Sequence, residues 1–203
     1  RQLQDTPVTA HKLLLHPADL ASPAIGLDRL AECLQTIGLI GKPVPLLNGQ
    51  FYPTGDRFLH LVTFLGCAPT IELDPPADPA ELADASAEGR FCHVYLTETE
   101  RVLFRADSQT LTARCPQCRK PEPAWEALIQ AWQLKPATTG WQCAACGHTG
   151  RPTDLLFRKT AGFGKTWVEI RGIYPSEAVP GDALLAALRA LSGCDWNTLY
   201  IKE

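Results

Sequence analysis

The sequence lacks methionine altogether, and it lacks any long apolar run. No stretch approaches the roughly 18 consecutive apolar residues that a membrane-spanning helix needs. The N-terminal residues also do not combine a basic segment, an apolar run and a cleavage site. We therefore expect a cytoplasmic protein without a membrane partner. The missing methionine leads us to expect at least a start residue before Arg1.

Charge of one sign does not dominate the chain, and this balance argues against a disordered or fibrous protein. Hydrophobic residues make up 45% of the 203 residues and charged residues 20%, with a formal net charge of −3. These proportions are close to the globular average, and the length suits one large domain or two modest ones. We expect a folded protein with a buried core.

Eight cysteines are too few for a disulfide scaffold of this length, but four of them form two C-x-x-C pairs. The pairs are Cys115-Pro-Gln-Cys118 and Cys143-Ala-Ala-Cys146-Gly147. In such a turn two thiolates reach one ion, and the glycine tolerates the left-handed backbone that is needed. The sequence therefore predicts one zinc ion per chain, and a redox-active or disulfide pair is the alternative.

The motifs CPQC and WQCAACG, with Trp141 two residues before the second pair, resemble the zinc-ribbon group. The resemblance covers residues 110–151 and implies a fold element, not a function. Four thiolates leave no coordination position for water, so the zinc is expected to hold the fold and not to polarise a substrate.

The 24 residues between the two cysteine pairs depart from the simplest ribbon because they include a predicted helix. Pro123 can begin it, and its apolar residues share one face: Trp125, Leu128, Ile129 and Trp132. We expect this face to pack against the rest of the protein. The alternative is an exposed docking surface for a partner.

The order of predicted elements indicates an α+β fold, with a mixed sheet, a few helices on one side and the helix-bearing zinc ribbon inserted. We expect an N-terminal α/β portion over 1–109, the ribbon over 110–151, and a hairpin, helix and strand over 152–203 packed with the N-terminal portion. An acidic, proline-rich connection covers 72–89. Strands are expected at 11–16, 57–66, 91–96, 102–105, 110–113, 154–158, 166–174 and 196–201, with helices starting near Ser22, Asp78, Pro123 and Asp182.

Basic residues surround the predicted ribbon. Residues 101–171 carry 11 Lys/Arg against 5 Asp/Glu, whereas residues 1–100 carry 6 against 13. The candidate partner-binding residues are Arg114, Arg119, Lys120, Trp141, His148 and Arg151. Phosphate contacts by the basic side chains and stacking on Trp141 would suit a nucleic acid. The overall pI of about 6.0 opposes a dedicated nucleic-acid binder.

Three functions therefore stay open. The first is a non-enzymatic binding or adaptor protein with a protein partner, and the second is a nucleic-acid-binding protein. The third is an enzyme, for which Asp56-Arg57, His60, Glu72 and Asp74 offer acid and base groups without a spacing that identifies a reaction. No residue is assigned a catalytic role.

The remaining cysteines, Cys33, Cys67, Cys92 and Cys194, are expected to act as small hydrophobic residues. Two alternatives use them: a second metal site of Cys67, Cys92 and His93, or a thiol nucleophile at Cys67 or Cys92 with His60 or His93 as base.

The segment Gly162-Phe-Gly-Lys-Thr166 resembles the end of a phosphate-binding loop. The first glycine of that motif is missing, because position 159 is lysine. We expect a glycine-rich hairpin turn here instead.

Overall fold

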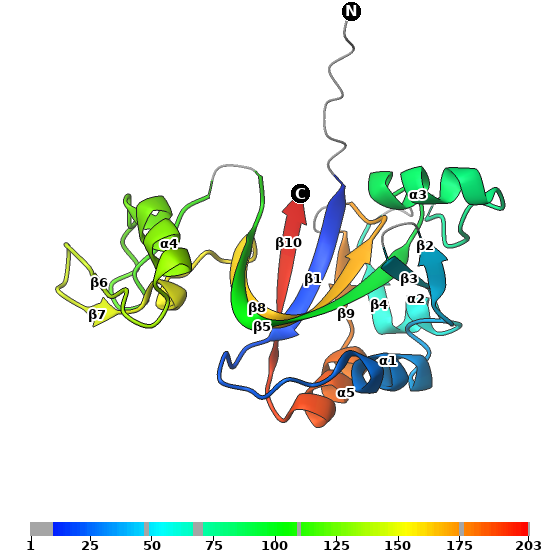
Figure 1. The fold of residues 1–203 in the computed structure, drawn as a ribbon, viewed down its shortest axis with the longest axis horizontal. Coiled ribbons are helices and arrows are strands. Elements are labelled where there is room, and N and C mark those ends of the chain that lie inside the picture. Colours follow the sequence, from blue (N-terminus) through cyan, green and yellow to red (C-terminus); the bar gives the residue numbers. More distant parts are fainter. Residues whose placement is uncertain (1–9, 47–48, 67–70, 109–110, 175–176, 203) are drawn as a thin grey trace, which may run out of the picture.

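The computed structural model describes residues 10–46, 49–66, 71–108, 111–174 and 177–202. Its main sheet has six strands (Figure 1). In spatial order these are β10 (Trp196–Lys202), β1 (His11–Pro17), β8 (Ala161–Arg171), β5 (His93–Ala106), β3 (Gly49–Pro53) and β2 (Val44–Leu46). The α+β class is confirmed, although neighbouring strands of this sheet pair antiparallel throughout and do not form a mixed sheet.

Two small sheets and five α-helices complete the described part of the chain. β4 (Val62–Phe64) pairs with β9 (Ala178–Pro180), and β6 (Trp141–Gln142) pairs with β7 (Thr149–Gly150). The helices are α1 (Leu27–Thr36), α2 (Phe58–Leu61), α3 (Pro79–Glu88), α4 (Trp125–Leu134) and α5 (Asp182–Ser192), with a 3₁₀ turn, η1, at Pro152–Asp154. None of the helices in the described residues is long and apolar enough to span a membrane.

Helix boundaries follow the local chemistry of the chain in two cases. Asp78 caps α3 as predicted, because its side chain accepts a hydrogen bond from the Ala80 N–H at 2.9 Å. α5 ends at Gly193, which has a left-handed φ of 77°. The first helix is present, but its predicted start was wrong: α1 begins at Leu27, not near Ser22. The carboxylate of Glu98 accepts from the N–H groups of Ile25 and Gly26, which holds the segment before the helix in a non-helical conformation.

The strand predicted over 57–66 is wrong in its first half. Phe58 and Leu61 are buried three residues apart, whereas Leu59 between them is 53% exposed. That spacing is helical, so α2 forms first and only Val62–Phe64 is extended.

The predicted hairpin over 154–174 is also wrong. β8 already begins at Ala161 and pairs with β5, so Gly162–Thr166 lies inside a strand and forms neither a turn nor a phosphate loop. The segments 91–96 and 102–105 belong to one strand, β5, that begins at His93. Residues 111–113 are not a strand, and Thr110 lies outside the described residues.

The main core lies on the face of the sheet that α1, α2 and α5 cover. Figure 1 shows α1 and α5 side by side below the sheet. Leu13 and Leu15 of β1 point to this face, where they pack with Leu30 of α1 and Leu184 of α5, all fully buried. The expected placement of helices on one side holds for these three helices, while α3 packs on a separate cluster around Phe51 and Phe91.

The other face is covered by the sheet itself, because β5 and β8 bend together into an arch (Figure 1). Their register shifts between Glu98 and Leu103. Beyond the bend, β8 passes so close to the sheet that a Cβ on Gly162 would lie 2.9 Å from Leu199, and one on Gly164 would lie 3.0 Å from Trp167. A side chain at either position would crowd these neighbours, so glycine suits the close approach of the arch.

A buried ionic cluster fastens the arch. Glu169 is 3% exposed and lies 3.4 Å from Lys12 Nζ, 2.9 Å from Arg105 Nη1 and 2.5 Å from Arg171 Nε. Arg105 lies on β5 beyond the bend, whereas Glu169 lies on β8 before the bend, opposite Tyr95. Their ion pair therefore joins the two halves of the arch. Burial alone would raise the pKa of Glu169, but Arg171, Lys12 and Arg105 together lower it to about 2.

We expect Glu169→Gln to lower the free energy of unfolding by about 3 kcal/mol at neutral pH, because three partly buried cations lose the buried carboxylate that they share. Urea denaturation measures the change. The matched control Glu100→Gln, at an exposed position of β5, should stay within about 0.5 kcal/mol of the unmodified protein.

Glu169→Gln should also change how stability depends on pH in the acid range. The folded pKa of about 2 lies below the ordinary value of 4.5, so the carboxylate's contribution is complete above pH 4.5 and is lost as the pH falls towards 2. Glu169→Gln should flatten the loss of stability in that window. Equal acid sensitivity in the two proteins would contradict the stabilising role of the cluster.

Candidate metal centre

The two cysteine turns have the same backbone geometry. In the first, the Arg119 N–H donates to the Cys115 carbonyl at 3.0 Å; in the second, the Gly147 N–H donates to the Cys143 carbonyl at 2.8 Å. The residue after each second cysteine is left-handed, with φ of 63° at Arg119 and 75° at Gly147. The sequence therefore places arginine at a position whose backbone favours glycine.

These turns bring the four sulfur atoms together, within 4.8 Å of one another. Between the turns, the Sγ atoms of Cys115 and Cys146 are 3.8 Å apart, and those of Cys118 and Cys143 are 3.7 Å apart. Zinc bound tetrahedrally with Zn–S bonds of about 2.3 Å requires sulfur separations of about 3.8 Å. The cluster could thus hold one metal ion of this size.

The thiols of the cluster do not ionise independently. A hydrogen bond from the Ala145 backbone, followed by smaller contributions, lowers the pKa of Cys143 to about 7. The His148 backbone acts to lower the pKa of Cys146, but burial and hydrogen bonds with the other thiols raise it to about 12. Four neighbouring thiols cannot all carry charge without a cation between them, and metal binding would displace their protons.

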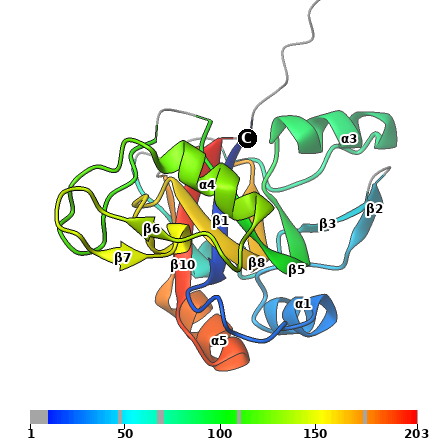
Figure 2. The same ribbon diagram turned by 60° about the vertical axis from the view of Figure 1, so that its left-hand side comes forward.

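The helix between the turns packs on the arch, as its apolar face predicted. The ring of Trp132 lies 5.2 Å from Phe163 of β8, edge to face, and that of Trp125 lies 6.3 Å from Phe104 of β5. Phe104 of β5 completes the contact, 5.0 Å from Phe163. Figure 2 shows α4 in front of the bent part of β5 and β8. The ribbon is thereby held against one end of the sheet.

The candidate partner-binding residues do not form one uniform surface. Arg119, Lys120 and Arg151 are exposed, while Arg114 and His148 are partly buried. Trp141 is only 7% exposed; its Nε1 donates to Glu122 at 2.9 Å, and its ring packs edge to face with His148. A ring buried in this way has little surface on which a nucleobase could stack.

The other cysteines show no sign of an activated thiol pair or of a second metal site among the described residues. Cys92 is fully buried and donates to the Gly172 carbonyl, and burial with the charge of Glu72 raises the pKa of its thiol to about 12. Cys33 and Cys194 are partly buried. Cys67 lies outside the described residues, so the alternatives that need it stay untested.

A serine and histidine pair that sequence spacing did not reveal lies beneath α3. Ser86 Oγ is 3.0 Å from His93 Nε2, while His93 Nδ1 donates to the Phe91 carbonyl at 2.8 Å. The histidine must therefore accept from the serine, whose oxygen accepts from Tyr95 at 3.0 Å. Burial, the largest cause, lowers the pKa of His93 to about 4. At 1% and 0% exposure the pair cannot meet a substrate and instead joins α3 to β5.

The acid and base groups considered for an enzyme are not assembled into a site. In the described part of the chain, no side-chain hydrogen bond or ion pair connects Asp56, His60 and Glu72 with one another. His60 lies at an exposed position on α2, and the Glu72 side chain accepts from the backbone of Asp74.

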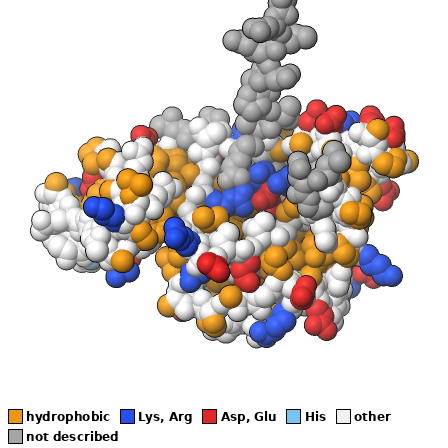
Figure 3. Space-filling model, in the orientation of Figure 1, with side chains coloured by type: hydrophobic (Ala, Val, Ile, Leu, Met, Phe, Trp, Pro, Cys, Tyr) orange, Lys and Arg blue, Asp and Glu red, His pale blue; other side chains and the backbone are white. Residues whose placement is uncertain are grey.

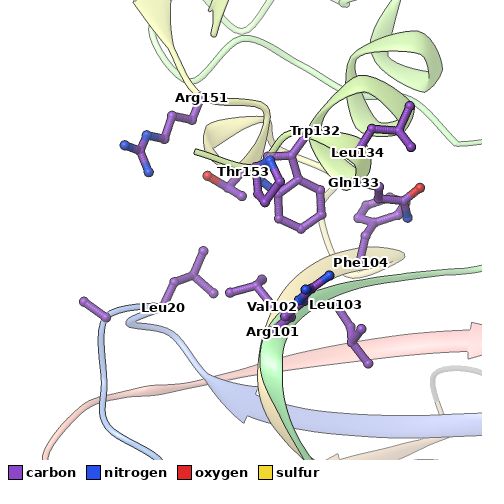
Figure 4. A pocket seen from close by; sticks show the side chains of 12 residues that line it. Leu20, Arg101, Val102, Leu103, Phe104, Trp132, Gln133, Leu134, Arg151 and Thr153 are labelled. Atoms are coloured by element: carbon purple, nitrogen blue, oxygen red, sulfur yellow. The ribbon is translucent and has the colours of Figure 1, made fainter. Parts of the chain in front are cut away.

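A groove that the sequence could not show lies between the ribbon and the arch, with a volume of about 870 Å³ (Figure 4). Val102 and Phe104 of β5 form one wall, and Trp132 and Leu134 at the end of α4 form the other. Leu20, in the loop after β1, closes one side. These segments are far apart along the chain, so only the tertiary fold brings them together.

Comparison with protein-family models, with curated proteins and with solved structures finds no match to this chain.

We expect Cys118→Ser to abolish stoichiometric metal binding and to unfold the ribbon, because structural zinc contributes roughly 10 to 16 kcal/mol in isolated finger peptides. Elemental analysis measures the metal, and fluorescence of the ribbon tryptophans reports on unfolding. The control Cys33→Ser changes a similarly half-buried thiol outside the cluster and should retain one zinc per chain.

The two left-handed positions allow a reciprocal test. Arg119→Gly should raise the stability of the metal-loaded protein by about 0.5 kcal/mol, because relief of left-handed strain exceeds the added chain entropy. Gly147→Ala should lower it by about 1 kcal/mol through backbone strain alone, since no atom lies within 4 Å of the new Cβ. Thermal unfolding measures both changes. If the two variants shifted the unfolding temperature in the same direction, one of the two predictions would be wrong.

Proposed function

We propose that this protein is a zinc-stabilised binding or adaptor protein, without catalytic activity of its own, and that one zinc ion per chain has a purely structural role. The observation that carries the proposal is the pair of sulfur separations, 3.7 and 3.8 Å, across the two cysteine turns. They match tetrahedral zinc with four thiolate ligands. Cys115, Cys118, Cys143 and Cys146 are the proposed ligands.

The donor set supports zinc and a structural role together. Four soft thiolates in tetrahedral arrangement suit zinc or an iron centre, and do not suit magnesium or calcium. Catalytic zinc sites keep a position for water or substrate, which a four-thiolate shell does not offer. The metal would thus link the two cysteine turns and stabilise the folded ribbon.

A ribbon held rigidly beside the arch is best suited to binding a partner. The thiol cluster holds the two cysteine turns together, and the aromatic contacts of α4 hold the ribbon beside the arch. A fixed ribbon gives the groove a permanent wall, which a partner can recognise without first ordering it. A protein partner is the proposed ligand class.

Nucleic acid is the second candidate, supported by the exposed Arg119, Lys120 and Arg151. The burial of Trp141 removes the stacking surface that this hypothesis used. A salt titration with single- and double-stranded oligonucleotides separates the two: a nucleic-acid binder must lose affinity steeply as the salt concentration rises.

Cobalt substitution tests the structural role of the metal. The cobalt(II) protein should show the absorption of a tetrahedral four-thiolate centre, and added imidazole should leave that spectrum unchanged because no ligand position is open. Cys146→His, which replaces the exposed ligand, should shift the spectrum and so prove its sensitivity to the ligand set. A response of the unmodified cobalt protein to imidazole would refute a purely structural metal.

A further inference from the structure

The groove between ribbon and arch combines an apolar floor with two arginines on opposite sides. Arg151 extends from the ribbon side and Arg101 lies on β5 (Figure 4). The floor is formed where the two walls meet, at Phe104 and Trp132, and Leu134 at the rim of the α4 wall is 83% exposed. Aromatic and arginine side chains are the types most enriched where proteins bind partners tightly.

The charge of the groove is of one sign. No aspartate or glutamate lines it. Within the described residues, neither Arg101 nor Arg151 forms an ion pair with a carboxylate. Both positions are exposed, so the guanidinium groups can make charge-assisted, bidentate hydrogen bonds with carboxylates of a ligand. An acidic ligand with apolar side chains complements this surface.

The shape of the groove favours a segment of a protein over a small molecule. Small-molecule sites usually enclose 70 to 90% or more of the ligand's surface. Here Leu103 is 41% exposed in addition to the rim residue Leu134, and both arginines are open to solvent. A chain can lie across such an open groove and insert one or two side chains between α4 and β5.

We infer that the groove binds an acidic segment of a partner protein, in which large apolar side chains enter between Phe104, Trp132 and Leu134 while carboxylates pair with Arg101 and Arg151. This inference rests on the proposed binding function and names the class of partner. The zinc contributes by holding α4, and therefore one wall of the groove, in place.

A second copy of this chain is a less suitable occupant. Its most acidic element is α3, at the end of the molecule away from the ribbon, where Figure 3 shows red side chains gathered. The acidic residues of α3 are exposed, but its large apolar residue, Leu82, is already packed against the cluster around Phe51 and Phe91. The helix would offer charge without an apolar side chain for the floor.

The test is selection from a displayed library of random peptides of about 12 residues, long enough to cross the groove. The zinc-loaded protein should enrich peptides that combine Asp or Glu with Leu, Phe or Trp. The double variant Arg101→Glu/Arg151→Glu should enrich basic peptides instead, because the sign of the groove is reversed. Arg29→Glu, an exposed change on α1 outside the groove, should select the same peptides as the unmodified protein.

Fluorescence polarisation with a labelled synthetic copy of an enriched peptide then measures affinity. The charge-reversed double variant should bind it at least about tenfold more weakly, and Leu134→Ala should also weaken it, while Arg29→Glu stays within about twofold. Sedimentation at matched concentrations checks for self-association through α3.

Four results overturn the inference. In the selection, these are the absence of any enriched peptide from zinc-loaded protein, or the same acidic peptides selected by the double variant. In the binding assays, these are displacement of the labelled peptide by oligothymidylate, or occupation of the groove by a second copy. Each leaves the cobalt spectrum unaffected, so failure of this inference is distinguishable from failure of the proposed structural metal.

Discussion

The antiparallel ladder between β5 and β8 is the constraint on which the rest of the structure depends. It runs from the pair His93 and Arg171 to the pair Ala106 and Ala161. Near its first end it lies in the middle of the sheet, over the core formed with α1 and α5. Past its bend it covers the opposite face of the sheet and presents Phe104 and Phe163 to the ribbon. One pair of strands thus serves the core, the arch and the attachment of the ribbon.

The ribbon is, in topological terms, the loop of the β5–β8 hairpin. A loop of this length loses much conformational entropy when it folds. Two kinds of interaction offset this cost. The thiol cluster closes the inner part of the loop between Cys115 and Cys146, and the rings of Trp125 and Trp132 attach the loop to the arch. Metal binding and aromatic packing are therefore complementary.

Features that depend on neighbouring residues could be predicted from the sequence. The spacing of Cys115, Cys118, Cys143 and Cys146 is dictated by how two thiolates of one turn reach an ion, so the cluster was predictable. The Asp78 cap and the end of α5 at Gly193 also follow from local hydrogen bonding. The α+β class followed from the order of such elements.

Features that depend on contacts between distant residues could not be predicted from the sequence. Gly162 and Gly164 suggest a turn, yet they lie inside β8, where the arch passes close to the side chains of Leu199 and Trp167. The extent of β5 and β8 was missed for the same reason, since pairing between strands determines it. The groove and the Ser86–His93 pair arise only where separate segments meet, and no sequence spacing encodes such a meeting.

The pairing of Ala106 with Ala161 also has a bearing on how the ribbon can vary. The inserted segment leaves the sheet and returns to it through two adjacent residues, so its own length does not alter the distance that it must span. Residues can therefore be gained or lost within the insert without shifting the register of any strand in the body. A module joined in this way can change in length while its host sheet stays the same.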